Sequence, residues 1–209
     1  MRAAGEAAVR RGAYTTAAAL LNRALEIAPS ELERARALLV AGRVDIATRR
    51  WDEAVERLDD VIRSAEENGD RILLGDALSW RARASWLQGS WRDAIERSVE
   101  DVAVLDGMGE SAELARALAR LSQIQMLRSL PEAEGTARRA IEVACRTGEG
   151  AAEANARTNL FTVLSVDGRI PSTTELEEIV GVAVAAGAHD EAARAVGNYL
   201  WSAALLGPL

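Results

Sequence analysis

A short turn signal recurs along the chain at nearly constant spacing, and this repetition restricts the fold more than any other feature of the sequence. Each copy is a triplet with an apolar third residue, and these third residues fall at positions 14, 51, 91, 130, 170 and 209, in steps of 37, 40, 39, 40 and 39 residues. Repeats of roughly 20–50 residues are stacked units that bury their apolar faces only against one another. The triplets are Gly12-Ala13-Tyr14, Arg49-Arg50-Trp51, Gly89-Ser90-Trp91, Arg128-Ser129-Leu130, Gly168-Arg169-Ile170 and Gly207-Pro208-Leu209.

A second glycine signal falls between successive triplets. Helices commonly end on glycine, because the left-handed residue after the last turn carries no Cβ penalty there. Two such stops in each period predict two helices per repeat, and the aromatic residues beside the turns (Tyr14, Trp51 and Trp91) are expected to pack in the core. The second signals are Gly69, Gly107 or Gly109, Gly148 or Gly150, and Gly187.

The helix after the first triplet carries a small residue, a bulky residue four positions later, an alanine after three more, and a proline at the end. This arrangement resembles the second helix of the tetratricopeptide (TPR) repeat. The first repeat matches fully with Ala17, Leu21, Ala24 and Pro29. Others match in part with Ala54, Leu58 and Val61, and with Ala133, Ala137 and Ala140, whereas two repeats depart with Ser98 and Asp101, and with Thr173 and Glu177.

The period exceeds the ~34 residues usual for the family. The resemblance therefore implies longer helices, as in TPR arrays of bacterial signalling ATPases, cyclases and large transcriptional regulators. We expect an all-α, right-handed superhelical solenoid of TPR-like helix-turn-helix repeats, forming one domain over residues 1–209. The expected hairpins are 1–29, 30–69, 70–109, 110–149 and 150–188, followed by an unpaired helix in 189–209.

Both ends of the sequence fall inside a repeat. The chain opens without a capping segment, and it stops where a return helix should begin, so we expect a fragment of a longer protein. The unpaired last helix should expose Leu200, Leu205 and Leu206, and exposed apolar faces of this kind predict a weak homodimer.

Composition narrows the classes of function. The chain has 32 acidic and 25 basic residues, a net charge of −7, which disfavours nucleic acid and anionic membranes as partners. Every basic residue is an arginine, so Schiff-base and phosphate-loop lysines are absent. There is no apolar leader sequence and no apolar run near the ~20 residues of a membrane span, so a cytoplasmic protein is expected.

The sequence lacks the sets of residues that catalysis and metal binding usually require. The chain holds one histidine, His189, and one cysteine, Cys145, which lie far apart in sequence. They supply neither zinc-ligand spacing nor a Cys–His pair, and glycine-rich phosphate loops are missing. Cys145 is expected to be a small buried hydrophobe. The sequence therefore predicts no enzyme, no metal site and no cofactor.

Binding residues are expected on the first helix of each hairpin, because the TPR resemblance implies that these helices line a concave groove. Arginine can bind carboxylates bidentately, tryptophan can pack a side chain, and amides can hold a peptide backbone. The alternative is that the tryptophans pack in the core between helices and that the arginines are solvated and bind nothing. The candidate groove residues are Arg36, Arg43, Trp80, Arg83, Trp86, Gln125, Asn155, Asn159 and Trp201.

Two functions remain open at this point. The first is a non-catalytic scaffold or regulatory module that binds a protein or peptide segment, including an attached signalling domain, in the groove. The second is an effector-sensing domain of a signalling ATPase, cyclase or transcription regulator that closes on a small anion through Arg36, Arg43 and Arg83. Converging guanidinium groups in a pocket would favour the second, and a long open groove the first.

Overall fold

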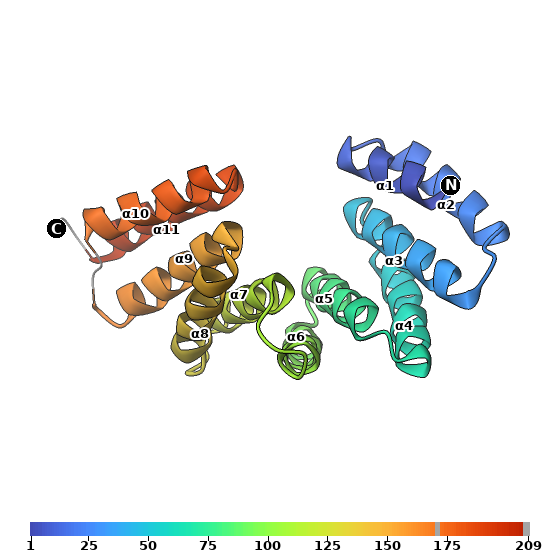
Figure 1. Ribbon diagram of the computed structural model, residues 1–209. Helices are drawn as coiled ribbons and strands as arrows, with labels where there is room; N and C mark the ends of the chain where they lie inside the picture. The colour runs from blue at the N-terminus through green and yellow to red at the C-terminus, as the bar shows by residue number, and fades with distance from the viewer. Residues whose placement is uncertain (170–171, 207–209) are drawn as a thin grey trace. The chain divides into compact units, whose positions relative to one another are not determined.

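The computed structural model describes residues 1–169 and 172–206, without the side chains of Arg10, Leu205 and Leu206. These residues form α-helices and no strand (Figure 1). The expected turn residues Ile170 and Gly207-Pro208-Leu209 lie outside the described residues. The helices are α1 (Arg2–Arg10), α2 (Tyr14–Glu26), α3 (Glu31–Ala47), α4 (Trp51–Asn68), α5 (Arg71–Leu87), α6 (Trp91–Asp106), α7 (Ala112–Leu127), α8 (Ala133–Thr147), α9 (Gly150–Val166), α10 (Thr173–Ala185) and α11 (His189–Leu206).

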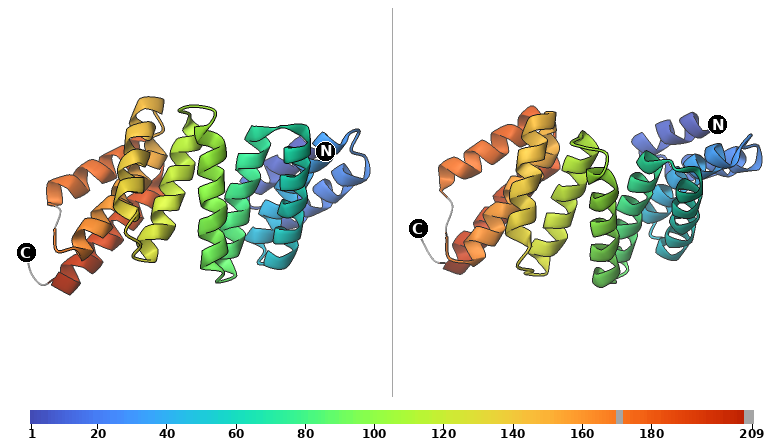
Figure 2. Two further views of the ribbon diagram at one scale, coloured as in Figure 1. Left: turned by 90° about the horizontal axis from the view of Figure 1, so that it is seen from below. Right: turned by 60° about the horizontal axis from the view of Figure 1, so that its bottom comes forward.

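The chain divides into two compact units, Met1–Val104 and Leu105–Leu209. Within the first unit, α1, α3 and α5 contact one another in succession, while α2 packs on α1 and α3, and α4 on α3 and α5. Within the second unit, α7, α9 and α11 contact in succession, with α8 on α7 and α9, and α10 on α9 and α11 (Figure 2). This successive packing of helices confirms the all-α repeat fold, whereas the single domain over residues 1–209 stays a prediction.

The predicted turns close the first helix of each hairpin by one repeated hydrogen bond. A backbone N–H just after the helix donates to the carbonyl five residues earlier, as from Arg50 to Asp45 at 2.8 Å and from Ser90 to Ser85 at 2.9 Å. The residue before each donor has a positive φ, which glycine tolerates best; Arg49 (φ 62°) and Ser129 (φ 51°) adopt it without being glycine. The turn of the fourth hairpin therefore begins at Ser129 and not at Arg128.

The small and bulky residues that alternate along the second helices of the hairpins are buried as predicted, and we call this row of residues the seam. Ala17, Leu21 and Ala24 of α2 are buried, and Ser98 and Asp101 of α6 are buried in the same seam although they are polar. In the fifth hairpin the expected register was wrong by one residue. Thr173 and Glu177 are exposed, and the seam is formed by Leu176, Ile179 and Ala183.

Two expectations about individual side chains are corrected. Tyr14 is 37% exposed, and Trp51 and Trp91 are only half-buried, so none of the three is a fully buried core residue. Cys145 is exposed and is not a buried hydrophobe. It follows Ala144, which occupies the buried seam, and a helix turns by about 100° from one residue to the next.

Candidate functional site

In the first unit, five of the candidate residues lie on the first helices of successive hairpins: Arg36 and Arg43 on α3, and Trp80, Arg83 and Trp86 on α5. We call this set the arginine–tryptophan face. The Arg43 guanidinium carbon lies 4.8 Å from the centroid of the Trp80 ring. This cation–π contact joins two neighbouring repeats and fixes the direction in which the guanidinium presents its N–H groups.

Arg36 is already neutralised by carboxylates of this chain. Its guanidinium lies 3.2 Å from Glu33 and 3.6 Å from Asp70, the N-cap residue of α5. The hydrogen bond from Arg36, helped by Arg2, holds the pKa of Glu33 below its ordinary value. Arg36 therefore links α3 to α5 and is less available to an acidic ligand than the sequence suggests.

The same arrangement recurs in the second unit. Arg116 lies 2.9 Å from Glu113 of its own helix and 3.1 Å from Glu149, the N-cap residue of α9. In both units an arginine near the start of a first helix pairs with a carboxylate three residues earlier and with the cap of the next first helix. A pair of this kind ties adjacent repeats together, which explains the arginine without a ligand.

Arg43 and Arg83 differ from Arg36. The Nε atom of Arg43 is buried and makes no hydrogen bond. Arg83 is exposed, and among the described residues it forms no hydrogen bond or ion pair. Trp80 packs its inner edge against the core of the first unit, and Trp86 is half-buried. The arginine–tryptophan face thus offers two guanidinium groups without a carboxylate partner beside two partly exposed indoles.

The candidate residues of the second unit are placed differently. Asn159 is fully buried, and its amide nitrogen lies 3.0 Å from the carbonyl oxygen of Ala119, 2.8 Å from the Ser122 hydroxyl and 2.9 Å from the Asn155 side-chain oxygen. Its own side-chain oxygen accepts from Arg194 at 2.9 Å. Asn159 therefore bridges α7, α9 and α11, and no ligand can reach it in this structure.

Two further candidates occupy opposite extremes of exposure. Gln125 on α7 is buried, and its Oε1 atom makes no hydrogen bond. Trp201 on α11 is 53% exposed. Asn155 is half-buried and also donates to Glu191 at 2.8 Å. The structure thus joins Asn155 to Asn159 by a hydrogen bond, and among the described residues no hydrogen bond joins Gln125 or Trp201 to either of them.

A buried arginine was missed by the sequence analysis. Arg81 on α5 lies 2.8 Å from Asp59 of α4 and 2.7 Å from Asp93 of α6, with its side chain only 11% exposed. Arg81 and Asp93 each also bond to Ser85. Burial alone would raise the pKa of Asp93, but the hydrogen bonds from Ser85 and Arg81 outweigh it and hold that pKa below its ordinary value.

A buried carboxylate was missed as well. Asp45 stands between two apolar residues near the end of α3 and is almost wholly buried. It pairs with Arg50 in the turn and with Arg57 of α4 at 3.2 Å. The sequence carried one signal for both residues: Asp45 and Arg81 are charged residues in helix segments that otherwise hold small and apolar residues. Both residues fix a first helix to the second helix that follows or precedes it.

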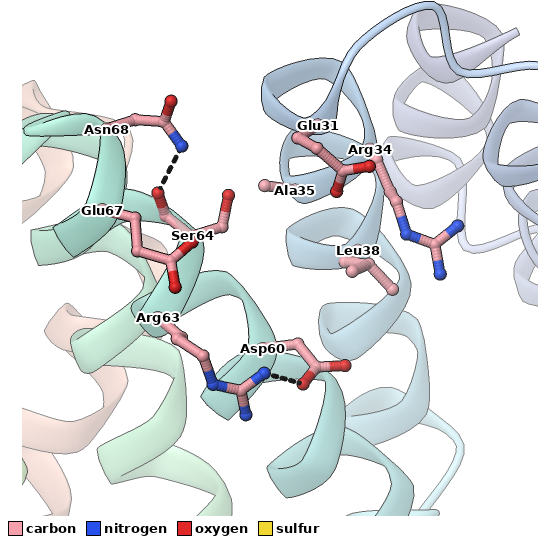
Figure 3. Close-up of a pocket in the computed structure, with 9 residues that line it drawn as sticks. All are labelled: Glu31, Arg34, Ala35, Leu38, Asp60, Arg63, Ser64, Glu67 and Asn68. Atoms are coloured by element: carbon pink, nitrogen blue, oxygen red, sulfur yellow. Dashed lines mark hydrogen bonds and ion pairs between the residues drawn. The ribbon is translucent and has the colours of Figure 1, made fainter.

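A hollow with a volume of about 480 Å³ lies between α3 and α4 of the first unit (Figure 3). Ala35 and Leu38 form its apolar floor, and Arg63 pairs with Asp60 at 3.1 Å on its rim. Carboxylates and guanidinium groups alternate around it, so no single charge dominates. Since a helix turns by about 100° per residue, this hollow and Arg34 lie on the side of α3 away from Arg36 and Arg43. Its lining residues are Glu31, Arg34, Ala35, Leu38, Asp60, Arg63, Ser64, Glu67 and Asn68.

Neither a metal site nor a membrane span is present in the described part of the chain. Histidine, cysteine and carboxylate side chains form no group of three that could hold a metal ion within residues 1–169 and 172–206. In the same ranges no helix is both long and apolar enough to cross a bilayer. His189 is exposed at the start of α11.

Comparison with known proteins agrees with this geometry. The tetratricopeptide repeat model matches residues 8–73. This part of the chain is a tetratricopeptide-repeat segment. No curated protein sequence matches the chain. TPR repeats typically mediate protein–protein interaction or scaffolding, and the fold is generally non-catalytic.

Solved structures extend the likeness along the whole chain. A signal transduction ATPase with numerous domains (STAND) and a tetratricopeptide repeat sensor, from Pyrococcus horikoshii, superposes with a TM-score of 0.80 at 13% identity, over 96% of this chain and 32% of that one. Aspartyl phosphate phosphatase F from Bacillus subtilis gives 0.74 at 14% identity, over 100% and 60%. Nearly identical TPR-like repeats assigned to a kinesin light chain of Podosopora anserina give 0.70 at 16%, over 87% and 92%.

These identities are low, so the solved structures show a shared TPR fold and nothing finer. The chain spans about a third of the STAND protein, in which the repeats accompany an ATPase. This chain shares with all three structures only its fold, which is the array of helical hairpins that the turn spacing predicts.

Proposed function

We propose that the chain is a regulatory TPR module whose first unit binds an acidic protein segment on the arginine–tryptophan face. One observation carries this proposal: Arg43 and Arg83 hold corresponding positions of successive repeats and lack a carboxylate partner, whereas Arg36 and Arg81 are already paired. An extended segment can place one carboxylate at each guanidinium and an apolar or aromatic side chain between them, against Trp80 and Trp86.

Energetic considerations support an acidic partner over a neutral one. The Arg43 guanidinium is partly desolvated by the Trp80 ring, and its buried Nε lacks a hydrogen bond. Partial desolvation strengthens the attraction between a guanidinium and a carboxylate, because the effective dielectric constant is lower than in water. Charge-assisted hydrogen bonds are also about twice as strong as neutral ones. The overall acidic charge of −7 limits binding of polyanions in general, so local geometry must select the ligand.

A TPR module of this kind can also contact other domains of a signalling protein. The STAND neighbour carries its repeats as a sensor beside an ATPase, and we propose by analogy that this chain senses or contacts a signalling domain, in the cytoplasm. In the second unit, Asn155 and Trp201 stay proposed binding residues, whereas Gln125 and Asn159 are buried. A second copy of this chain is a further proposed partner, through α11.

Fluorescence anisotropy with labelled peptides tests the proposal. The probe is a decapeptide in which glutamate and aspartate alternate with leucine and phenylalanine, and its control carries glutamine and asparagine instead. We expect the acidic peptide to bind more tightly, with an affinity that falls as salt rises. The double variant Arg43→Gln, Arg83→Gln should weaken binding by about tenfold or more, equivalent to about 1.4 kcal/mol.

The matched control is the double variant Arg34→Gln, Arg63→Gln, which removes the same charge on the other side of α3 and on α4. It should leave the affinity within about twofold, because screening weakens distant surface charges. Equal binding of the acidic and neutral peptides, or equal losses in the two double variants, would contradict the proposal. Circular dichroism confirms that each variant stays helical.

A small anionic effector is the alternative ligand for the same guanidinium groups. Arg36 is largely neutralised by Glu33 and Asp70, so only Arg43 and Arg83 remain for it. A competition experiment distinguishes the small anion from the acidic peptide as the ligand. Citrate, as a compact polyanion, should displace the bound peptide only at concentrations where added chloride of equal ionic strength does so too. Displacement by citrate alone would favour the effector.

A further inference from the structure

Two arginines share one buried carboxylate near the end of α3. Asp45 is only 1% exposed, and its Oδ1 atom accepts a hydrogen bond from the Nε atom of Arg50 at 2.9 Å. Its Oδ2 atom lies 3.2 Å from the Nε atom of Arg57 but accepts no hydrogen bond. Among the described residues none accepts a hydrogen bond from Arg57, which is therefore held by charge alone. Two guanidinium charges thus meet one carboxylate charge, and the N–H donors of Arg57 stay available.

Both arginines line a second hollow of the first unit, which has a volume of about 260 Å³ and is bounded by α2, α3 and α4. Its apolar lining consists of Ala18, Ala41 and Val44. Ala41 and Asp45 stand two residues before and two residues after Arg43 in sequence, so they lie about 160–200° from Arg43 around α3. The hollow is therefore separate from the arginine–tryptophan face.

The hollow also holds two acceptor groups that no arginine uses. Glu53 belongs to α4, one turn before Arg57, and Asn22 belongs to α2. Both side chains are exposed, and among the described residues neither forms a hydrogen bond or an ion pair. The hollow thus presents guanidinium donors, a carboxylate acceptor and an amide acceptor beside an apolar surface.

A ligand that fits this lining needs both signs of charge. The Glu53 carboxylate repels a simple anion, and the two guanidinium groups repel a simple cation. A ligand carboxylate can accept charge-assisted hydrogen bonds from a guanidinium, while a ligand ammonium carries three N–H donors for the Glu53 and Asn22 oxygens. The volume lies below the roughly 300–1,000 Å³ of sites for drug-sized ligands, so the ligand must be small.

We propose that this hollow binds an aliphatic α-amino acid as its zwitterion. The ligand carboxylate lies at Arg57 and the ligand ammonium at Glu53. The aliphatic side chain lies against Ala18 and Ala41. Because α2 belongs to the first hairpin and α4 to the second, the bound amino acid joins two successive repeats. Such a ligand stabilises the folded first unit, since the unfolded chain does not assemble the site.

Thermal unfolding in the presence of amino acids tests the proposal. L-Leucine at up to about 20 mM should raise the midpoint of unfolding progressively, because it binds only the folded state. N-acetyl-L-leucine lacks the ammonium group and L-leucinamide lacks the carboxylate, so neither should raise the midpoint. No shift with leucine, valine or alanine would overturn the proposal, as would an equal shift with N-acetyl-L-leucine.

Variants followed by NMR titration with L-leucine locate the site. Glu53→Gln and Arg57→Gln should each raise the dissociation constant by about tenfold or more. Glu56→Gln is the matched control, because it removes the same charge from an exposed position of α4 outside the hollow. Equal losses in Glu53→Gln and Glu56→Gln would overturn the assignment. The double variant Arg43→Gln, Arg83→Gln should bind leucine like the wild type, which separates this site from the proposed peptide face.

Discussion

Gly42 of α3 lies directly against Leu58 of α4, so that a Cβ atom added to Gly42 would lie 3.0 Å from the Leu58 Cγ atom. One repeat earlier, a Cβ on Gly5 would lie 2.9 Å from the Cγ atom of Leu21. Both pairs are separated by 16 residues, from 42 to 58 and from 5 to 21. The two helices of a hairpin approach closely because a glycine faces a fully buried leucine.

Replacing Gly42 by alanine should therefore destabilise the protein, although alanine is the better helix former. The new methyl group must displace Leu58, and overpacking costs about 1–3 kcal/mol, against a helix-propensity gain of about 1 kcal/mol. We expect a net loss of about 1 kcal/mol in urea denaturation. Gly135→Ala is the control: no atom lies within 4 Å of the added Cβ, so it should stabilise the protein by up to about 1 kcal/mol. Equal effects of the two changes would contradict the close approach.

Removing the Arg81 guanidinium should be among the costlier single changes in the first unit. Arg81→Met keeps most of the buried stem but leaves Asp59 and Asp93 without their partner. Breaking a fully buried pair costs about 3–5 kcal/mol, and since both carboxylates are partly exposed we expect about 2 kcal/mol by denaturant unfolding. Arg23→Met, which removes a pair exposed on both sides, should cost less than about 0.5 kcal/mol. Similar costs at the two sites would contradict the role given to Arg81.

The Asp93 carboxylate should make the first unit less stable in acid. Its pKa is lowered in the folded protein because the bonds from Ser85 and Arg81 outweigh burial, so its contribution is complete above the unfolded value of about 3.9. That contribution is lost as pH falls through the unfolded value towards the lower folded one. The difference in unfolding free energy between wild type and Asp93→Asn should be constant near neutral pH and shrink below about pH 4. A difference that does not change with pH would contradict the ion pair.

Cys145 should react with thiol reagents in the folded protein. It is exposed, but partial burial and the nearby charge of Glu153 raise the pKa of its thiol above the ordinary value. Alkylation by iodoacetamide should therefore be slow at pH 7 and rise with a midpoint above about 8.5. Glu153→Gln should lower that midpoint, because it removes a negative charge beside the thiolate. Alkylation only after unfolding would contradict the exposure.

The fold could be predicted from the sequence because repetition leaves a signal that a single element lacks. The turn spacing, the paired glycine stops and the Ala17, Leu21 and Ala24 seam all point to helical hairpins, and the structure confirms them. The register failed where this signal weakens. At the fifth hairpin the turn is not followed by a small residue in the expected place, and the structure places the seam at Ile179 and Ala183.

The candidate site was predicted less well, because the sequence gives the face of a residue but not its partner. Arg36 and Arg43 share a face of α3, yet Arg36 meets Asp70 and Arg43 meets Trp80, residues 34 and 37 positions away. Asn159 likewise satisfies its hydrogen bonds through residues of neighbouring repeats, which include Ser122 and Arg194. Such pairing depends on where adjacent repeats place their side chains, and the period alone does not reveal it.

The claim that Arg43 and Arg83 select an acidic partner is tested most directly by peptide selection. A random peptide display library is selected in parallel on the wild type, on Arg43→Gln, Arg83→Gln and on Arg34→Gln, Arg63→Gln. We predict that aspartate and glutamate are enriched on the wild type and on the Arg34, Arg63 variant but not on the Arg43, Arg83 variant. Enriched acidic peptides on all three proteins, or on none, would contradict it.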